Sequence, residues 1–195
     1  MSAENEIINY VRKFVPLSDE EALELQSAFK RVAIRKRQFV VQPGFPVPYR
    51  YYVVDGSLRA YVVNEEGQEH TISFAVEDWW ITDYNGYIYQ QNATMFVVAL
   101  EDSVALRLEF SKEQELKARN PKFETFFRII AERGLAYQQR RVINNLTLSA
   151  EQRYQDFLDK YPLIARRLPQ YALASFLGMT TEYLSRLRRR ASRKS

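Results

Sequence analysis

The residues from Leu173 to Arg190, LASFLGMTTEYLSRLRRR, combine the residue types and the spacing of a motif that contacts DNA bases. Where two helices meet at a steep angle, the residue at the contact must be small and the turn must tolerate a positive φ. Counted from Gln170, Ala174 is the fifth residue and Gly178 the ninth, and these are the positions where the two requirements fall. The segment therefore predicts a helix-turn-helix.

The same register assigns an inner and an outer face to the motif. The buried positions that hold the two helices together are occupied by Leu173, Leu177, Leu184 and Leu187. Thr180 follows the turn and can cap the second helix with its hydroxyl group. The outer face of the second helix carries Thr181, Glu182, Ser185 and Arg186. A structural helix pair without a role in binding is the alternative to a functional motif.

The side chains of the outer face suggest how DNA would be read. The N-terminal residues of a recognition helix meet base edges, and flanking cations meet phosphates. Arg186 can contact the O6 and N7 atoms of a guanine, and Glu182 can accept a hydrogen bond from a cytosine amine. Phosphate contacts are expected from Arg188, Arg189, Arg190, Arg193 and Lys194. Alternatively, these cations belong to a solvated, frayed C-terminus.

The distribution of charge indicates a polyanionic partner. The chain of 195 residues carries a net charge of +4. Residues 149–195 contain ten basic and four acidic residues, a balance of +6, whereas the preceding residues contain 18 basic and 20 acidic residues, a balance of −2. Nucleic acid and membrane lipid are both polyanions that attract such a segment.

The composition excludes several kinds of chemistry. The chain contains no cysteine and a single histidine, His70, which excludes disulfides, thiolate metal sites and histidine-rich metal sites. No nucleophile–base pair, phosphate-binding glycine loop or cluster of metal ligands stands out, so we expect neither an enzyme nor a cofactor. The N-terminus lacks the pattern of a signal peptide, and no apolar run reaches about 18 residues. We therefore expect a cytoplasmic protein without a membrane partner.

Three kinds of segment precede the motif. The first thirty residues are expected to be helical, with a capping box formed by Ser18 and Glu21. Residues 31–109 contain short β-type runs separated by turn residues, which predicts a small barrel, sandwich or roll. Residues 122–146 then form one long helix, and a second capping box of Ser149 and Gln152 begins another helix. The predicted fold class is α+β.

The long helix carries an apolar stripe that needs a partner. The residues on which this prediction rests are Phe123, Phe127, Ile130, Gly134 and Tyr137. The stripe packs either against the protein's own sheet or against a second copy of the helix. We favour the second copy, which makes these five residues the expected dimer contacts.

The order of strands, long helix and helix-turn-helix resembles the cyclic-AMP receptor protein and fumarate-nitrate regulator (Crp/Fnr) family of bacterial transcription factors. The resemblance rests on residues 51–80, YYVVDGSLRAYVVNEEGQEHTISFAVEDWW, and on residues 173–189, LASFLGMTTEYLSRLRR. It implies a cyclic-nucleotide-binding-type, jelly-roll-like β-roll at 1–118, a dimerisation helix at 119–147 and a DNA-binding domain at 148–195. The implied function is that of a homodimeric regulator of a palindromic operator. A small-molecule sensor or protein-interaction module with a vestigial helix-turn-helix is the alternative.

The end of the chain departs from the family's pattern. Many members continue from the recognition helix into a two-stranded wing, whereas ASRKS follows Arg190 here. We expect this basic tail to replace the phosphate contacts of the wing. The alternative is that the recognition helix is held less firmly and DNA binding is weak.

The effector pocket departs from the family's pattern as well. Nucleotide-binding members hold the ribose with a Gly-Glu pair and the cyclic phosphate with an Arg-Ser/Thr-Ala stretch. The corresponding residues here are Thr82-Asp83 and Gln91-Asn92-Ala93, and residues 60–106 contain eight acidic residues but no Lys or Arg. A buried phosphate without a cation carries an uncompensated desolvation cost. We therefore expect no useful affinity for cyclic AMP or cyclic GMP.

Aromatic residues dominate the rest of the pocket segment. They either fill the space of a nucleotide, which is the interpretation we favour, or bind a neutral or cationic small-molecule effector by stacking and cation–π contacts. The candidate effector-pocket residues are Trp80, Thr82, Asp83, Tyr84, Gln91 and Asn92.

Overall fold

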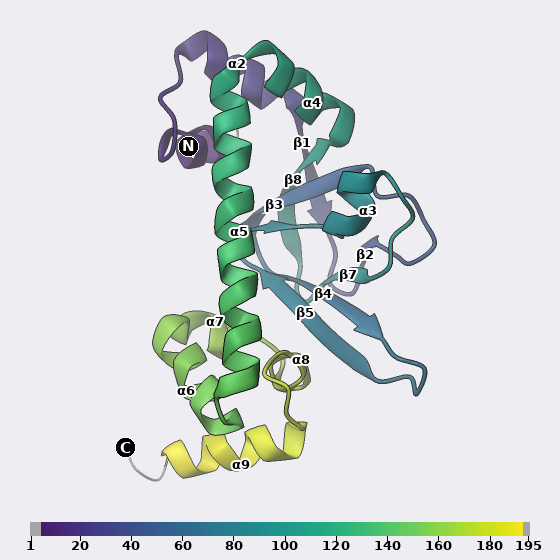
Figure 1. Ribbon diagram of the computed structural model, residues 1–195, viewed down its shortest axis with the longest axis vertical. Helices are drawn as coiled ribbons and strands as arrows, with labels where there is room; N and C mark the ends of the chain where they lie inside the picture. The colour runs from purple at the N-terminus through teal and green to yellow at the C-terminus, as the bar shows by residue number, and fades with distance from the viewer. Residues whose placement is uncertain (1–4, 193–195) are drawn as a thin grey trace. The chain divides into compact units, whose positions relative to one another are not determined.

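The protein, seen in a computed structural model that describes residues 5–192, consists of two compact units (Figure 1). The first unit comprises the described residues up to 60 together with 74–135, and the second comprises 61–73 together with the described residues from 136 onward. The predicted domain boundaries fall after residues 118 and 147 and leave the hairpin at 61–73 with the other strands. In the observed division this hairpin belongs instead to the unit that contains the C-terminal helices.

The β-roll consists of two four-stranded sheets, with the strand orders β1-β8-β3-β6 and β2-β7-β4-β5. The strands are β1 (Phe29–Ile34), β2 (Phe39–Val41), β3 (Tyr49–Asp55), β4 (Leu58–Val63), β5 (Glu69–Ala75), β6 (Trp80–Ile81), β7 (Phe96–Ala99) and β8 (Ser103–Glu109). A short helix, α3 (Tyr84–Tyr89), follows β6. Gly56 makes the turn between β3 and β4 with a φ of +93°, and a Cβ atom there would overlap the side chain of Ser103.

Helices close the core of the first unit over the sheet that contains β3 and β8. These helices are α1 (Asn5–Arg12), α2 (Asp19–Ala28), α4 (Phe110–Arg119) and the first part of α5 (Pro121–Thr147). Tyr52 of β3 and Leu108 of β8 lie in one buried cluster with Leu25 of α2 and with Phe123 and Phe127 of α5. Phe123 and Phe127 are therefore core residues of this chain. This corrects the prediction that they line a dimer contact.

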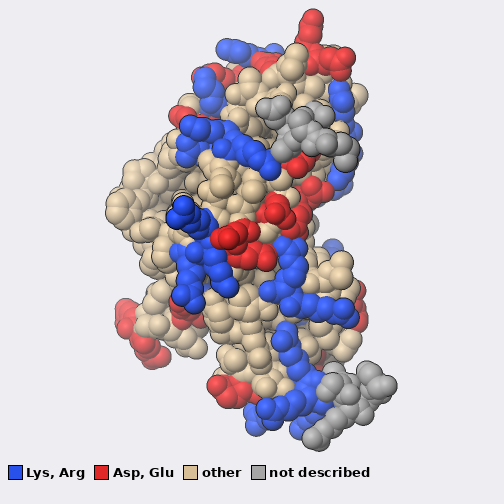
Figure 2. All heavy atoms as spheres, turned by 180° about the vertical axis from the view of Figure 1, so that it is seen from behind, with Lys and Arg blue, Asp and Glu red and all other residues tan. Residues whose placement is uncertain are grey.

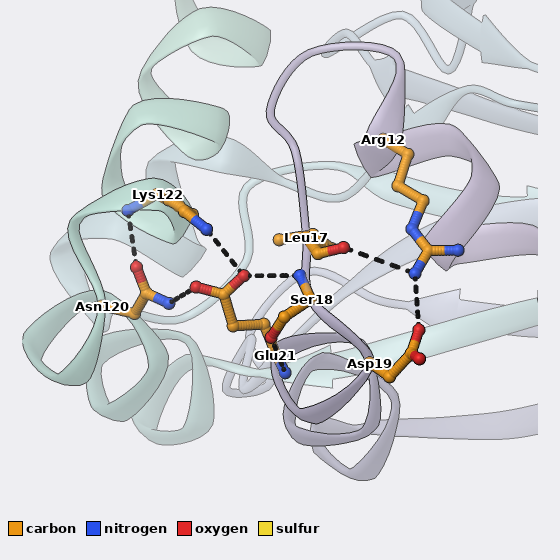
Figure 3. A network of polar contacts seen from close by, with 7 residues as sticks. All are labelled: Arg12, Leu17, Ser18, Asp19, Glu21, Asn120 and Lys122. Carbon is orange, nitrogen blue, oxygen red and sulfur yellow. Dashed lines mark hydrogen bonds and ion pairs between the residues drawn. The ribbon is translucent and has the colours of Figure 1, made fainter.

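Polar contacts around Glu21 link α2 to the start of α5 (Figure 3). Ser18 and Glu21 form the predicted capping box, in which Ser18 N donates to Glu21 Oε2 at 2.7 Å. Lys122 Nζ donates to the same oxygen at 2.7 Å, and Asn120 Nδ2 donates to Oε1 at 2.8 Å. The bond from Lys122, followed by those from Ser18 and Asn120, lowers the pKa of Glu21 from 4.5 to about 2.

The second unit is helical except for its hairpin. Its helices are the rest of α5, α6 (Ala150–Lys160), α7 (Pro162–Arg167), α8 (Gln170–Phe176) and α9 (Thr181–Ser192). The second predicted capping box, Ser149 with Gln152, is present at the start of α6. Thr71 N donates to Ser175 Oγ at 2.9 Å, and this hydroxyl donates to the Glu69 carbonyl at 2.9 Å. The hairpin is thus hydrogen-bonded to α8.

These elements confirm the predicted α+β class and the order of β-roll, long helix and C-terminal helices. Helix α5 is 27 residues long and begins and ends within one residue of the predicted bounds. Within residues 5–192, no helix combines the length and the apolar character needed to cross a bilayer.

Candidate nucleic-acid interface

Helices α8 and α9 form the predicted helix-turn-helix. Gly178 lies in the turn between them with a φ of +67°, a conformation that favours glycine. Ala174, at the predicted contact, is buried, and so are Leu173 and Leu184 on the two facing helices. The small residue, the turn residue and the apolar positions all occupy the places that the spacing predicted.

Several hydrogen bonds fix the end of α8 and the start of α9. The Tyr183 backbone N–H donates to Thr180 Oγ1 at 3.2 Å, which is the predicted N-cap. Gln170 Nε2 of α8 donates to the Thr181 carbonyl at 3.2 Å, and Arg153 Nε of α6 donates to the Leu177 carbonyl at 2.9 Å. Gln170 and Arg153 were not predicted to hold the motif, because the sequence does not show which carbonyls a side chain can reach.

The outer face of α9 is polar and exposed. Thr180, Glu182 and Arg186 are exposed, and Thr181 and Ser185 beside them are half-buried. The guanidinium carbon of Arg186 lies 5.6 Å from the centre of the Tyr183 ring, one turn earlier on the helix. The residues predicted to meet base edges therefore share one side of the helix.

The arginines that follow differ in their surroundings. Arg189 and Arg190 are exposed, and Figure 2 shows Lys and Arg side chains gathered at the lower end of the view, where α9 lies in Figure 1. Arg188 is half-buried, and its Nη2 donates to the Ala165 carbonyl of α7 at 3.1 Å. This hydrogen bond joins α9 to α7. Arg193 and Lys194 lie outside the described residues.

Helix α5 exposes an apolar stripe in its second half. Leu135, Val142 and Leu146 are 71%, 57% and 81% exposed, and their spacing of seven and four residues places them on one side of the helix. Of the predicted dimer residues, Gly134 is exposed, Tyr137 is half-buried and Ile130 packs against the core of the first unit. The exposed stripe thus begins later in the helix than the sequence suggested.

A buried cation lies among the aromatic residues of the predicted effector pocket. Arg50 of β3 is only 5% exposed, and its guanidinium carbon lies 5.7, 5.8 and 4.9 Å from the ring centres of Trp80, Tyr84 and Tyr87. Arg50 Nη2 donates to Glu113 Oε1 at 2.9 Å, and the Tyr87 hydroxyl donates to Oε2 at 2.9 Å. Burial, and next the Glu113 carboxylate, raises the pKa of Tyr87. These rings contact a cation that the protein itself supplies.

Two other candidate effector residues support the backbone. Thr82 Oγ1 donates to the Tyr49 carbonyl at 2.9 Å. Asp83 is fully buried, and its Oδ1 accepts from two backbone N–H groups at the start of α3, at 3.0 and 3.2 Å. Its Oδ2 accepts from Thr94 N at 2.6 Å. Asp83 therefore caps α3 with one oxygen and bonds the segment after α3 with the other, and Thr82 bonds the segment before α3 to β3.

Comparisons with known proteins give a consistent result. The model of the cyclic nucleotide-binding domain matches residues 31–120. The anaerobic regulatory protein of Pasteurella multocida is 24% identical over 187 residues, which cover 88% of this chain and 66% of that protein. The regulatory protein HlyX of Actinobacillus pleuropneumoniae is 23% identical over 185 residues, which cover 88% of this chain and 75% of that protein.

Solved structures share the fold. FixK2 from Bradyrhizobium japonicum superposes with a TM-score of 0.75 at 16% identity and 85% coverage of both chains. A transcriptional regulator described as a Crp/Fnr family member, from Eubacterium rectale, superposes with a TM-score of 0.71 at 14% identity, covering 95% of this chain and 88% of that one. The chain is therefore similar to bacterial regulatory proteins in sequence and shares the fold of a Crp/Fnr family regulator.

The Crp/Fnr pattern places Gln91 and Asn92 near the position where nucleotide-binding members are expected to carry an arginine and a serine or threonine. Both side chains are exposed in this protein. The cation that lies near the pocket aromatics comes instead from β3, and it is paired with Glu113. Within the described residues, no group of three or more His, Asp or Glu side chains is placed to hold a metal ion.

Proposed function

We propose that the protein is a sequence-specific DNA-binding transcription regulator of the Crp/Fnr type, and not an enzyme. The observation that carries this proposal is the two-sided character of α9. Leu184 and Leu187 dock one side of the helix in the core of the second unit, while Glu182 and Arg186 are exposed on the other. Relatives named as regulatory proteins support the proposal. A protein with this role acts where DNA is, so we propose a cytoplasmic location.

We also propose that the regulator is a homodimer joined along α5. The exposed stripe of Leu135, Val142 and Leu146 has the heptad-like spacing of a two-helix contact. A two-fold dimer presents two copies of α9 to half-sites about 34 Å apart, one turn of DNA, so the operator is a palindrome.

Two classes of contact are assigned within α9. Base contacts come from the side chains at its start, which are Thr180, Thr181, Glu182, Ser185 and Arg186. Phosphate contacts come from Arg189 and Arg190 near its end. The first class sets which sequence is bound, and the second contributes affinity for any sequence.

The two classes can be separated by fluorescence anisotropy on an operator selected from random DNA. Arg186→Ala should cost about 1–3 kcal/mol and abolish discrimination at one base position of each half-site. Arg190→Ala should weaken operator and random DNA alike and lower the slope of log affinity against log salt by about 1. Equal losses on operator and random DNA for both variants would contradict the assignment.

We propose that the β-roll does not respond to cyclic AMP or cyclic GMP. The buried Arg50 is engaged by Glu113, and the exposed Gln91 and Asn92 carry no charge that could neutralise a cyclic phosphate. An effector of the roll is therefore neutral or cationic, if the roll has one. Isothermal titration with either nucleotide should give no saturable heat, and a dissociation constant in the micromolar range or tighter would overturn the proposal.

A further inference from the structure

A hollow on the second unit lies outside the base-contacting face of α9. It is lined by the second half of α5, by α6 and by the end of α8. Two kinds of side chain make up most of its wall. The cations are Arg140, Arg141, Arg153 and Lys160, and aromatic rings such as Phe157 and Tyr161 lie between them.

The charges in the hollow are not balanced. Asp156 is the carboxylate that lines it, and Asp156 Oδ1 lies 2.5 Å from Lys160 Nζ. The three arginines have no carboxylate partner among the described residues. Arg153 donates to the carbonyls of Leu148 and Leu177, and Arg140 is exposed. Three guanidinium groups therefore share a concave surface whose lining carboxylate is already paired with Lys160.

Arg141 is half-buried, and backbone carbonyls accept its hydrogen bonds. Its Nη2 donates to the Thr71 carbonyl at 2.9 Å, its Nη1 donates to the Ile72 carbonyl, and its guanidinium carbon lies 4.3 Å from the centre of the Phe176 ring. Its buried Nε has no hydrogen-bond partner. Burial lowers the pKa of Arg141, because carbonyl groups compensate a buried charge less well than an anion does.

The rings of the hollow form a continuous apolar wall beside these cations. Phe157 lies 5.4 Å from Tyr161 and 5.7 Å from Phe176, measured between ring centres. Such a wall stacks on a flat ring, and a guanidinium group pairs with a carboxylate or phosphate through parallel hydrogen bonds.

We propose that this hollow binds a small aromatic oxyanion, with its carboxylate or phosphate group between Arg140 and Arg141 and its ring against Phe157 and Tyr161. The bound anion compensates the buried charge of Arg141 and links α5 to α6 and α8. This site is separate from the candidate effector pocket of the β-roll and does not depend on DNA binding.

Isothermal titration of the full chain at constant ionic strength tests the proposal, with phenyl phosphate, benzoate and inorganic phosphate as probes. We expect saturable binding of phenyl phosphate or benzoate that is tighter than that of inorganic phosphate, because only the first two offer a ring. Which of the two binds more tightly identifies the anionic group. Absence of saturable binding for both ring compounds overturns the proposal.

Variants show whether the bound anion occupies the hollow. Arg140→Gln should weaken binding about tenfold or more, and it should not unfold the protein, because this side chain is exposed. Arg128 lies on the same helix outside the hollow, so Arg128→Gln should leave the affinity for the ring compounds unchanged. Arg190→Gln controls for binding on α9 and should also leave it unchanged. A loss with Arg190→Gln, or equal losses with Arg128→Gln and Arg140→Gln, contradicts the assignment.

Discussion

Replacing Leu146 by glutamate tests the proposed dimer at its most exposed apolar residue. Leu146 is 81% exposed in the single chain. Because burying a leucine side chain fully is worth about 1.5–3 kcal/mol, covering the exposed part contributes about 1–2.5 kcal/mol in each copy. A two-fold dimer contains this residue twice, so Leu146→Glu removes about 2–5 kcal/mol before charge repulsion is added. The dissociation constant should rise roughly 30-fold to a few thousand-fold.

Sedimentation equilibrium over a range of protein concentrations measures this constant. Leu23→Glu is the matched control, because Leu23 is 65% exposed on α2, away from the stripe of α5. The control should dimerise like the unsubstituted protein, and circular dichroism should show that both variants are folded. An unchanged dissociation constant for Leu146→Glu, or a monomeric unsubstituted protein at micromolar concentration, would refute the reasoning.

Four further substitutions test the fold. Gly178→Ala should destabilise the protein by about 1–2 kcal/mol in thermal unfolding, because of the positive φ at this turn. Gly134→Ala in the open part of α5 should instead stabilise it, by up to about 1 kcal/mol, and the reverse order would contradict the turn geometry. Arg50→Met leaves the fully buried Glu113 with Lys117 as its cation partner and should cost about 1.5–3 kcal/mol, measured by urea unfolding. A loss below about 1 kcal/mol would show that Glu113 does not need this partner. For Glu21, the folded pKa of about 2 lies below the ordinary 4.5, so the stabilisation by the carboxylate is complete above about pH 4.5 and is lost as the pH falls toward 2. The difference in melting temperature between the protein and Glu21→Gln should shrink across that window, with Glu20→Gln as control, and a constant difference would disprove the linkage.

Features that depend on local sequence were predictable. The two capping boxes need only a serine and a side chain three residues later, and both are present. The turn at Gly178 and the cap at Thr180 also follow from spacing, because φ and the N-cap hydrogen bond are set within a few residues. The helix-turn-helix was therefore placed residue by residue.

Features that depend on contacts between distant segments were not predictable in the same way. The periodicity of α5 shows that Phe123 and Phe127 share a face, but it does not show that the sheet of the same chain covers that face. Counting charges within residues 60–106 missed Arg50, because β3 brings this cation to the aromatic residues from outside the segment. Arg188 was assigned by its neighbours in sequence, whereas its hydrogen bond to Ala165 is a tertiary contact.

The central claim is that α9 reads a DNA sequence as part of a dimer. Selection of bound fragments from a random DNA pool by the purified protein, followed by sequencing, tests it most directly. The account predicts a palindrome whose half-sites are centred about 10 bp apart, and it predicts that Arg186→Ala selects this palindrome with one base position of each half-site left unspecified. Recovery of random fragments, or of the fully specified palindrome with Arg186→Ala, would contradict it.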